Sequence, residues 1–340
     1  MTQLSGFGRA EHPRPDPASL RDDILPLVGD ALDRVELLFR ENLASPVGIV
    51  HEIGEFVVAG DGKRLRPTLH LLCTRLCGYG GPHDVVLATV LELIHGATLI
   101  HDDVIDEATT RRGRASANFR WGNQVTVLFG DYMFAKAMQM ALRAESLEVM
   151  ELLAEATLRM TEGEMLQTRY VGRLDVSADE CVSLIEKKTA ALFGCCCELA
   201  AILAGKDARH RKALRRYGRH LGITFQLIDD LLDFTGNEGV MGKPVASDLR
   251  SGKATLAVID ALSDDGDEVR ALATLIMDGE HDGTVGRLTK LLDATGALHR
   301  TRELAASHAA EATRQLEPFA PGPARDALEA LPALLLCRDH

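Results

Sequence analysis

Two short stretches of the chain each carry three aspartates at one spacing. They are Asp102, Asp103 and Asp106 in LIHDDVID, and Asp229, Asp230 and Asp233 in QLIDDLLDF. On an α-helix, residues four apart share a face, so the first and last aspartates of a stretch point the same way and repel each other. A hard divalent cation that also binds phosphate oxygens suits carboxylates placed like this. The spacing therefore predicts two metal sites on helices.

Clustered acids usually mark a solvated helix face, but the neighbours of these acids are apolar. Leu99, Ile100 and Val104 surround the first group, and Leu227 and Ile228 precede the second. Apolar residues on several sides indicate a buried helix, and buried carboxylates need a partner. If the two helices face each other, their acids enclose room for the phosphates of a substrate.

Basic residues lie close to both acidic stretches. They are Lys63, Arg64 and Arg66 before Pro67, Arg111 and Arg112 after the first stretch, and Lys243 and Lys253 around a glycine-rich loop after the second. Any one of these groups is typical of a solvated loop. The first also precedes a helix start, where the helix dipole favours anions. Together the groups favour two polyphosphates, one bound through metal and one bound directly.

The elements that carry these residues read as helices throughout. Hydrophobic residues make up 46% of the chain but aromatics only 4%, a composition typical of helical proteins. Periodicity predicts helices over about 83–106 and 208–234, and a third from a Ser177 capping box to Ala204. Three or four more are expected after the glycine-rich loop, and no stretch alternates like a strand. The fold class is therefore all-α, with residues 1–18 expected to be disordered and 19–340 to form one domain.

Charge and cysteine content narrow the class of protein. The chain has 38 basic and 50 acidic residues, a net charge of −12, which argues against a nucleic-acid partner. Neither a long apolar run nor a signal-peptide core is evident, so we expect no integral membrane segment and a cytoplasmic location. The seven cysteines lack a disulfide framework. His70, Cys73 and Cys77 share a helix face, but core packing explains them better than a soft-metal site.

Six motifs in order resemble the trans-isoprenyl diphosphate synthases, or polyprenyl synthetases. They are GKRLRP at 62–67, LIHDDVIDEATTRRG at 99–113, GD at 130–131, KT at 188–189, FQLIDDLLD at 225–233 and GKPVASDLRSGKAT at 242–255. The resemblance implies an all-helical isoprenoid synthase type I fold around a central cavity, and a homodimer. It also implies head-to-tail condensation of isopentenyl diphosphate with an allylic diphosphate, assisted by three magnesium ions.

The resemblance also implies a role for each residue that matches a motif. Isopentenyl diphosphate is assigned to Lys63, Arg66, His95 and Arg112, and the allylic diphosphate to Arg111, Lys188, Thr189 and Gln226, with Lys243 and Lys253 closing over it. Magnesium is assigned mainly to Asp102, Asp106 and Asp229, with Asp103 and Asp233 in support, and the catalytic set also includes Asp230 and Lys188. One departure is visible, because Ala246 stands where the family often has glycine.

Product length is expected to depend on the residues below the first acids. Ala97 and Thr98 lie five and four residues before Asp102, where family members with short products commonly place an aromatic floor. Small residues there predict a product longer than farnesyl, such as a quinone side-chain precursor. Met133, Phe134 and Met138 are candidates for a deeper floor, although core packing explains them better.

Other functions remain open at this stage. A farnesyl or geranylgeranyl diphosphate synthase would share every motif. A class I terpene cyclase has little use for Lys63, Arg66 and Arg112, which address a second diphosphate. A non-catalytic subunit of a heteromeric synthase usually loses acids from one site, whereas this chain keeps both. The exact product length, the preferred primer and the downstream pathway do not follow from the sequence.

Overall fold

The fold is a stack of long α-helices in a computed structural model, which describes residues 17–60, 62, 64–111, 113–236 and 244–338. The first half contains α1 (Pro17–Leu43), α2 (Gly48–Val58), α3 (Leu65–Leu76), α4 (His83–Ile105), α5 (Ala117–Trp121), α6 (Asn123–Ala141) and α7 (Leu147–Tyr170). The second half contains α8 (Ala178–Ile185), α9 (Ala191–Leu203), α10 (Ala208–Thr235), α12 (Ser247–Arg250), α13 (Leu256–Asp265), α14 (Asp267–Met277), α15 (Thr284–Ala294), α16 (Ala297–Arg314) and α17 (Pro323–Leu336). The all-α prediction is confirmed.

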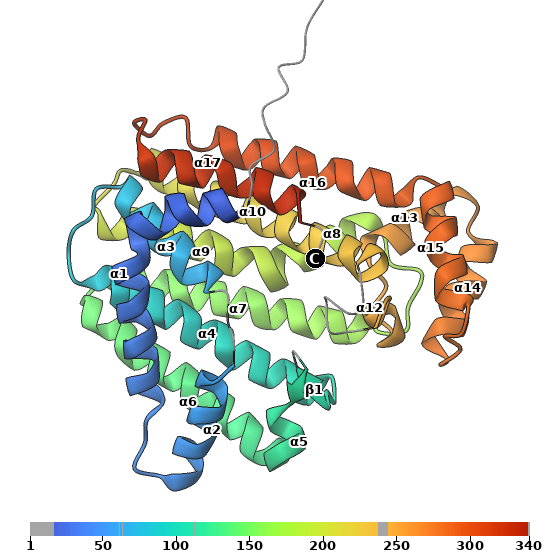
Figure 1. The fold of residues 1–340 in the computed structure, drawn as a ribbon, viewed down its shortest axis with the longest axis horizontal. Coiled ribbons are helices and arrows are strands. Elements are labelled where there is room, and N and C mark those ends of the chain that lie inside the picture. Colours follow the sequence, from blue (N-terminus) through green and yellow to red (C-terminus); the bar gives the residue numbers. More distant parts are fainter. Residues whose placement is uncertain (1–16, 61, 63, 112, 237–243, 339–340) are drawn as a thin grey trace, which may run out of the picture.

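The helices that carry the motifs lie inside the stack. α4 packs along α6 and against α1 and α3, while α10 packs against α9 and α16. Figure 1 shows α16 and α17 along one edge of the molecule and α14 and α15 at one end. α7 packs on α9, and α9 in turn packs on α4. The helices bearing the two acidic stretches are therefore held by shared neighbours.

Among the residues that the structure describes, three clusters of buried side chains form the interior. The largest joins α1, α3, α4, α6, α7 and α9 and includes Leu91, Met133 and Phe193. A second lies under α12 to α15, and a third under α8, α10 and α13. Ala254 and Leu298 pack against both smaller clusters, so these are continuous. A single domain over 19–340 stays a prediction, and the segment expected to be disordered, 1–18, lies mostly outside the described residues.

Helix α4 is the one described helix long and apolar enough to cross a membrane, with a mean hydropathy of 1.4 over its most apolar window. The expectation of no long apolar run in the sequence is therefore wrong. However, 67% of that window is buried inside the fold. A core helix surrounded by other helices passes the same test of length and composition. The absence of an integral membrane segment stays a prediction.

The helix expected to run unbroken from Ser177 to Ala204 is interrupted. Ser177 and Glu180 form the predicted capping box, in which the Ser177 N–H donates to Glu180 Oε2 at 2.8 Å. However, residues Glu186–Ala190 form a π-helical turn between α8 and α9. Gly163 of α7 lies so close that a Cβ there would be 2.7 Å from the Lys188 backbone nitrogen. A widened turn pressed against a neighbouring helix depends on tertiary contact, which periodicity does not report.

Two further expectations were wrong in detail. Five described helices, α13 to α17, follow the glycine-rich loop instead of three or four, and the short α12 forms inside it. Gly283 and Gly296 adopt positive φ angles of 73° and 75° directly before α15 and α16, and so divide the apolar pattern into short helices. Two antiparallel strands of two residues each, β1 (Thr110–Arg111) and β2 (Arg114–Ala115), also form in the basic loop after α4. Strands this short leave no alternation to detect.

The buried side chain of His70 makes the stability of the fold depend on pH. Its ring is fully buried, and Nδ1 lies 2.9 Å from the Cys196 carbonyl oxygen. Burial lowers the pKa of His70 to about 4. The unfolded chain binds a proton at this histidine near pH 6.5, whereas the folded chain does not. The contribution of His70 to the free energy of unfolding is therefore fully present above pH 6.5 and is lost as the pH drops toward 4.

We expect the free energy of unfolding to fall by roughly 2 kcal/mol from His70 alone between pH 7.5 and pH 5. Denaturant titrations at the two pH values measure it, with His70→Gln as the comparison. The variant should lose that part of the pH dependence, whatever its stability at pH 7.5. An unchanged pH dependence in His70→Gln would contradict the assignment.

Candidate active site

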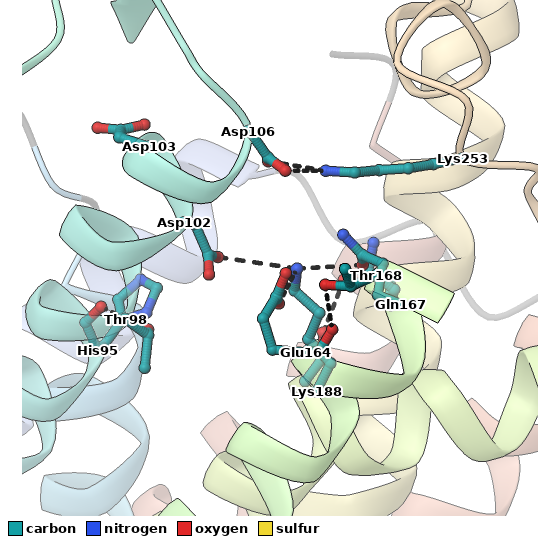
Figure 2. A network of polar contacts seen from close by, with 12 residues as sticks. His95, Thr98, Asp102, Asp103, Asp106, Glu164, Gln167, Thr168, Lys188 and Lys253 are labelled. Carbon is teal, nitrogen blue, oxygen red and sulfur yellow. Dashed lines mark hydrogen bonds and ion pairs between the residues drawn. The ribbon is translucent and has the colours of Figure 1, made fainter. Parts of the chain in front are cut away.

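The first acidic stretch forms the last turn of α4, and its three carboxylates are not equivalent. The side chains of Asp102 and Asp106 are 19% and 33% exposed, whereas Asp103 is buried. Arg111 Nε donates to Asp103 Oδ1 at 2.7 Å. Figure 2 shows Asp103 turned away from the group formed by Asp102, Asp106, Lys188 and Lys253. Asp103 therefore fixes the basic loop, and the other two acids line the site.

Lys188 reaches the first acids from the π-helical turn. Its Nζ lies 3.8 Å from Asp102 Oδ2 and 2.5 Å from Glu164 Oε2, and it donates to Gln167 Oε1 at 3.1 Å (Figure 2). Glu164 and Gln167, three residues apart on α7, were missed by the sequence reading. One acid and one amide on an amphipathic helix carry no distinctive signal. Their role becomes visible only when α7 packs against the turn that bears Lys188.

The electrostatics of this cluster depend on burial. Burial raises the pKa of Asp102 to about 6; the charge of Glu164 adds to the rise, and that of Lys188 opposes it. Burial also tends to lower the pKa of Lys188, but Asp102 and Glu164 together raise it above the ordinary value. Lys188 therefore stays cationic between two carboxylates. A cation or a phosphate that enters the cluster competes for groups that already hold each other.

The second acidic stretch lies near the end of α10 and divides in the same way. The Asp229 side chain is 40% exposed, and Arg338, at the C-terminal end of the described chain, lies 3.7 Å from its Oδ1. Asp230 and Asp233 are buried. Burial, and then the charge of Asp248, raises the pKa of Asp230 well above its usual range. The acids that are not fully buried are thus Asp102, Asp106 and Asp229, those assigned to magnesium from the sequence.

A hydrogen-bond chain joins the second stretch to the π-helical turn. The Thr189 hydroxyl donates to Gln226 Oε1 at 2.8 Å, and Gln226 Nε2 donates to Asp230 Oδ1 at 2.8 Å. Thr189 follows Lys188, which contacts Asp102. Two adjacent residues of one turn therefore connect the acids of α4 with those of α10.

A second connection runs through the loop before α13. Lys253 Nζ lies 2.7 Å from both carboxylate oxygens of Asp106 (Figure 2). The Lys253 backbone N–H donates to the Asp248 carbonyl oxygen at 2.8 Å. The backbone N–H groups of Ser247 and Asp248, and the Ser247 hydroxyl, donate to the Asp233 carboxylate. Two separate routes thus bring the acidic helices to one site.

Ala246, the one departure from the family pattern, belongs to the second route. Its φ of 56° lies in the left-handed region, where glycine carries no steric penalty. Its N–H donates to the Asp233 carbonyl oxygen at 2.7 Å, and its side chain is fully buried. The loop therefore keeps the backbone shape that glycine favours.

The remaining basic residues separate into two kinds. Arg64 pairs with Glu36 and Glu92 at 2.8 and 2.9 Å, so its charge is used within the fold. The Arg66 guanidinium lies 5.0 Å from the centre of the Phe193 ring. Its buried Nε has no hydrogen-bond partner in the described part of the chain. A buried donor in that state is consistent with an anionic ligand. Lys63, Arg112 and Lys243 lie outside the described residues, and His95 lies on the α4 face of Asp102.

Comparison with known proteins places this arrangement. Residues 47–294 match the polyprenyl synthetase family. The chain belongs to the polyprenyl synthetase family. This match confirms the family that the sequence motifs predicted. It also confirms the predicted enzyme class, a prenyltransferase.

Relatives match this polyprenyl synthetase over nearly their whole length. The octaprenyl diphosphate synthase of Escherichia coli K12 is 38% identical over 88% of this chain and 93% of its own. The structure of a decaprenyl diphosphate synthase from Rhodobacter capsulatus superposes with a TM-score of 0.87 at 37% identity, over 94% and 99% of the two chains. A polyprenyl synthase from Caulobacter crescentus, complexed with calcium and isoprenyl diphosphate, gives 0.88 at 35%, over 94% and 98%.

The three acids that face the site of this polyprenyl synthetase suit a magnesium ion by donor type. Carboxylate oxygens are the ligands that magnesium prefers. Asp102, Asp106 and Asp229 each have an ammonium or guanidinium group nearby, at 3.8, 2.7 and 3.7 Å. These cations neutralise the three carboxylates, and a bound divalent ion would do the same. Within the described residues, no three His, Cys, Asp or Glu side chains already stand at metal-binding distances.

The residues below the acids are small, as the sequence indicates. Ala97 is buried in the large core cluster, and the Thr98 hydroxyl donates to the His95 carbonyl oxygen at 2.8 Å. Met133 is fully buried, and its methyl group occupies the space that a side chain on Gly96 would need. Core packing is wrong for Phe134, which is exposed on the surface of α6, whereas Met138 packs at the edge of the core. Met133 therefore packs on α4, as the core interpretation predicts.

Proposed function

We propose that the chain condenses isopentenyl diphosphate head-to-tail with an allylic diphosphate, in the presence of magnesium, to make an all-trans polyprenyl diphosphate longer than farnesyl. The observation that carries this proposal is the double connection between the acids of α4 and α10. Lys188 with Thr189, and Lys253 with Asp248, tie the two acidic stretches to one site. A site with acids on two sides and lysines between them binds a diphosphate through metal and through cations together.

The proposed roles follow from which groups face the site. Magnesium bound by Asp102, Asp106 and Asp229 would stabilise the negative charge of the leaving diphosphate. Lys188 and Lys253 exchange their carboxylate partners for oxygens of the allylic diphosphate. Arg66, which is half-buried, binds the isopentenyl diphosphate, with Lys63, His95 and Arg112. We propose three magnesium ions in this site. The similar Caulobacter crescentus protein, which is complexed with calcium and isoprenyl diphosphate, supports the binding of a divalent cation.

The reaction itself breaks the bond between the allylic carbon and its diphosphate oxygen. The isopentenyl double bond attacks the resulting allylic cation and forms the new carbon–carbon bond. The proton then lost passes to the released diphosphate, so charge and atoms balance. The apolar residues below the acids, such as Ala97 and Ile94, keep water away from the cation.

A long product is supported by the small side chains and by the relatives. The similar Escherichia coli and Rhodobacter capsulatus proteins are named for octaprenyl and decaprenyl products. Ala97 and Thr98 put no aromatic ring below Asp102. A quinone side-chain precursor is the use that we propose for such a product.

We further propose a cytoplasmic homodimer formed through α6 and α7. Large apolar side chains on the surface of these helices and their connection support it: Leu128, Phe134, Leu142, Leu147, Leu158 and Met165 are all exposed. A surface of this kind is typical of an interface between subunits. A second copy is the occupant that closed two-fold symmetry favours.

Product analysis tests the proposed function. Purified protein is incubated with magnesium, isopentenyl diphosphate and farnesyl diphosphate, and the dephosphorylated products are separated by chain length. We expect linear products longer than farnesyl. A cyclic hydrocarbon would favour a terpene cyclase, and elongation that requires an added second protein would favour a subunit of a heteromeric synthase. Products that stop at geranylgeranyl would refute the long-chain part.

A further inference from the structure

The last turn of α4 carries its charges in an unfavourable place. Asp102 and Asp103 lie at the C-terminal end of the helix, followed by Asp106 as its cap, and no basic residue belongs to that turn. The C-terminal end of a helix dipole is negative, so each carboxylate there is repelled by the dipole and by its neighbours. The turn that bears the metal-facing acids therefore depends on contacts from elsewhere.

Three of those contacts are ion pairs: Lys188 contacts Asp102, Arg111 contacts Asp103 and Lys253 contacts Asp106. The proposed function assigns two of these cations, Lys188 and Lys253, to the substrate. When an allylic diphosphate binds, the two lysines turn to its oxygens. The last turn of α4 thus loses ion pairs that stabilise it in the free protein. It loses them when substrate is bound and the positions of its carboxylates matter most.

A fourth contact involves neither an acid of the turn nor a substrate cation. His101, the residue before Asp102, lies over Gly130 of α6. A Cβ on Gly130 would be 2.3 Å from His101 Nε2 and 2.5 Å from Cδ2. The same nitrogen lies 3.2 Å from the Val127 carbonyl oxygen and 3.3 Å from Asp131 Oδ1. Gly130 therefore forms a notch in α6 that fits an imidazole ring, and the adjacent groups accept its N–H.

We propose that His101, seated in the notch of Gly130, is a positioning residue that fixes the metal-bearing turn of α4 while the substrate cations change partners. This inference gives the Gly130–Asp131 pair a role, and it rests on the proposed function. Gly130 supplies the space for the ring. The Val127 carbonyl fixes its orientation, and Asp131, which is 65% exposed, adds a weaker contact.

A double-mutant cycle tests the seat, with Gly130→Ala, His101→Ala and the double variant. Three quantities are measured: kcat and KM for farnesyl diphosphate, the affinity for Mn²⁺ alone, and the melting temperature. Gly130→Ala should displace the ring, lower kcat/KM about 10- to 100-fold, mainly through kcat, and weaken Mn²⁺ binding about 10-fold. With His101→Ala the clash is gone, so Gly130→Ala should cause no further loss and should raise the melting temperature by about 2 °C, as alanine does inside a helix.

Gly286→Ala is the matched control, because its Cβ would have no atom within 4 Å and it lies in α15, far along the chain from the site. It should leave all three quantities unchanged or raise the melting temperature slightly. The same loss from Gly130→Ala with and without His101, or no loss at all, would overturn the proposal. If Gly130→Ala alone fails to fold, recovery of folding in the double variant supports the seat and failure to recover refutes it. Wild-type protein that does not elongate farnesyl diphosphate would refute the proposed function instead, and the Mn²⁺ and melting data would still decide the seat.

Discussion

Replacing Asp102 with asparagine is expected to lower kcat for chain elongation about 10²- to 10³-fold. Asp102 faces the site from α4 with Lys188 3.8 Å away. An asparagine keeps the shape of the side chain but lacks the charge that would hold a divalent cation against the leaving diphosphate. Steady-state kinetics with radiolabelled isopentenyl diphosphate, at several magnesium concentrations, measure the effect.

Asp103→Asn is the matched control for that result. Asp103 is buried and accepts from Arg111 Nε at 2.7 Å, so its loss loosens the basic loop rather than removing a metal ligand. We expect a loss of about 10-fold in kcat/KM, as for a partner that only orients another group, with little change in the magnesium dependence. Equal losses for Asp102→Asn and Asp103→Asn, with equal magnesium dependence, would contradict the division of the acids drawn from their exposure.

Replacing Ala97 with phenylalanine is expected to shift the product distribution to shorter chains. Ala97 lies below Asp102 in the core, and a ring there would occupy space that we assign to the growing prenyl chain. Reversed-phase chromatography of the dephosphorylated products measures the shift. Because a large side chain in a packed core also costs about 1–3 kcal/mol of stability, melting curves accompany the assay.

Thr98→Val serves as the control for Ala97→Phe. It removes a hydroxyl that already donates to the His95 carbonyl oxygen and adds no bulk. Its products should keep the wild-type lengths. An unchanged distribution in Ala97→Phe, with the protein folded and active, would show that the prenyl chain extends along another path.

The sequence contains enough to locate the acids and the two helices that bear them. α4 and α10 are long, strongly periodic and close to the expected ranges, since they end at Ile105 and Thr235. Periodicity is a local property, so it predicts such helices well. The spacing of the acids likewise shows that the first and last of each stretch share a face.

What the sequence could not predict arises from contacts between distant segments. The π-helical turn at Glu186–Ala190 forms where α7 presses on it at Gly163. Glu164 joins the site only because that turn presents Lys188 to α7. Arg338 reaches Asp229 across more than a hundred residues of sequence. None of these contacts leaves a periodic or spaced pattern in the chain.

The position of each acid also needed the fold. Asp233 looked equivalent to Asp106 by spacing, but it is buried and accepts hydrogen bonds from the Ser247 and Asp248 backbone. Its role in the structure is to hold the loop that leads to Lys253. The spacing of a motif thus predicts which acids share a helix face, whereas the packing around it decides which of them can meet a ligand.

The stoichiometry of the reaction tests the central claim most directly. Isopentenyl diphosphate incorporated into linear product and inorganic diphosphate released are measured in one reaction with farnesyl diphosphate as primer. A site that joins both acidic stretches and binds two diphosphate substrates predicts one diphosphate released for each isopentenyl unit added, over several additions. Diphosphate released from the primer without incorporation of isopentenyl units would contradict it.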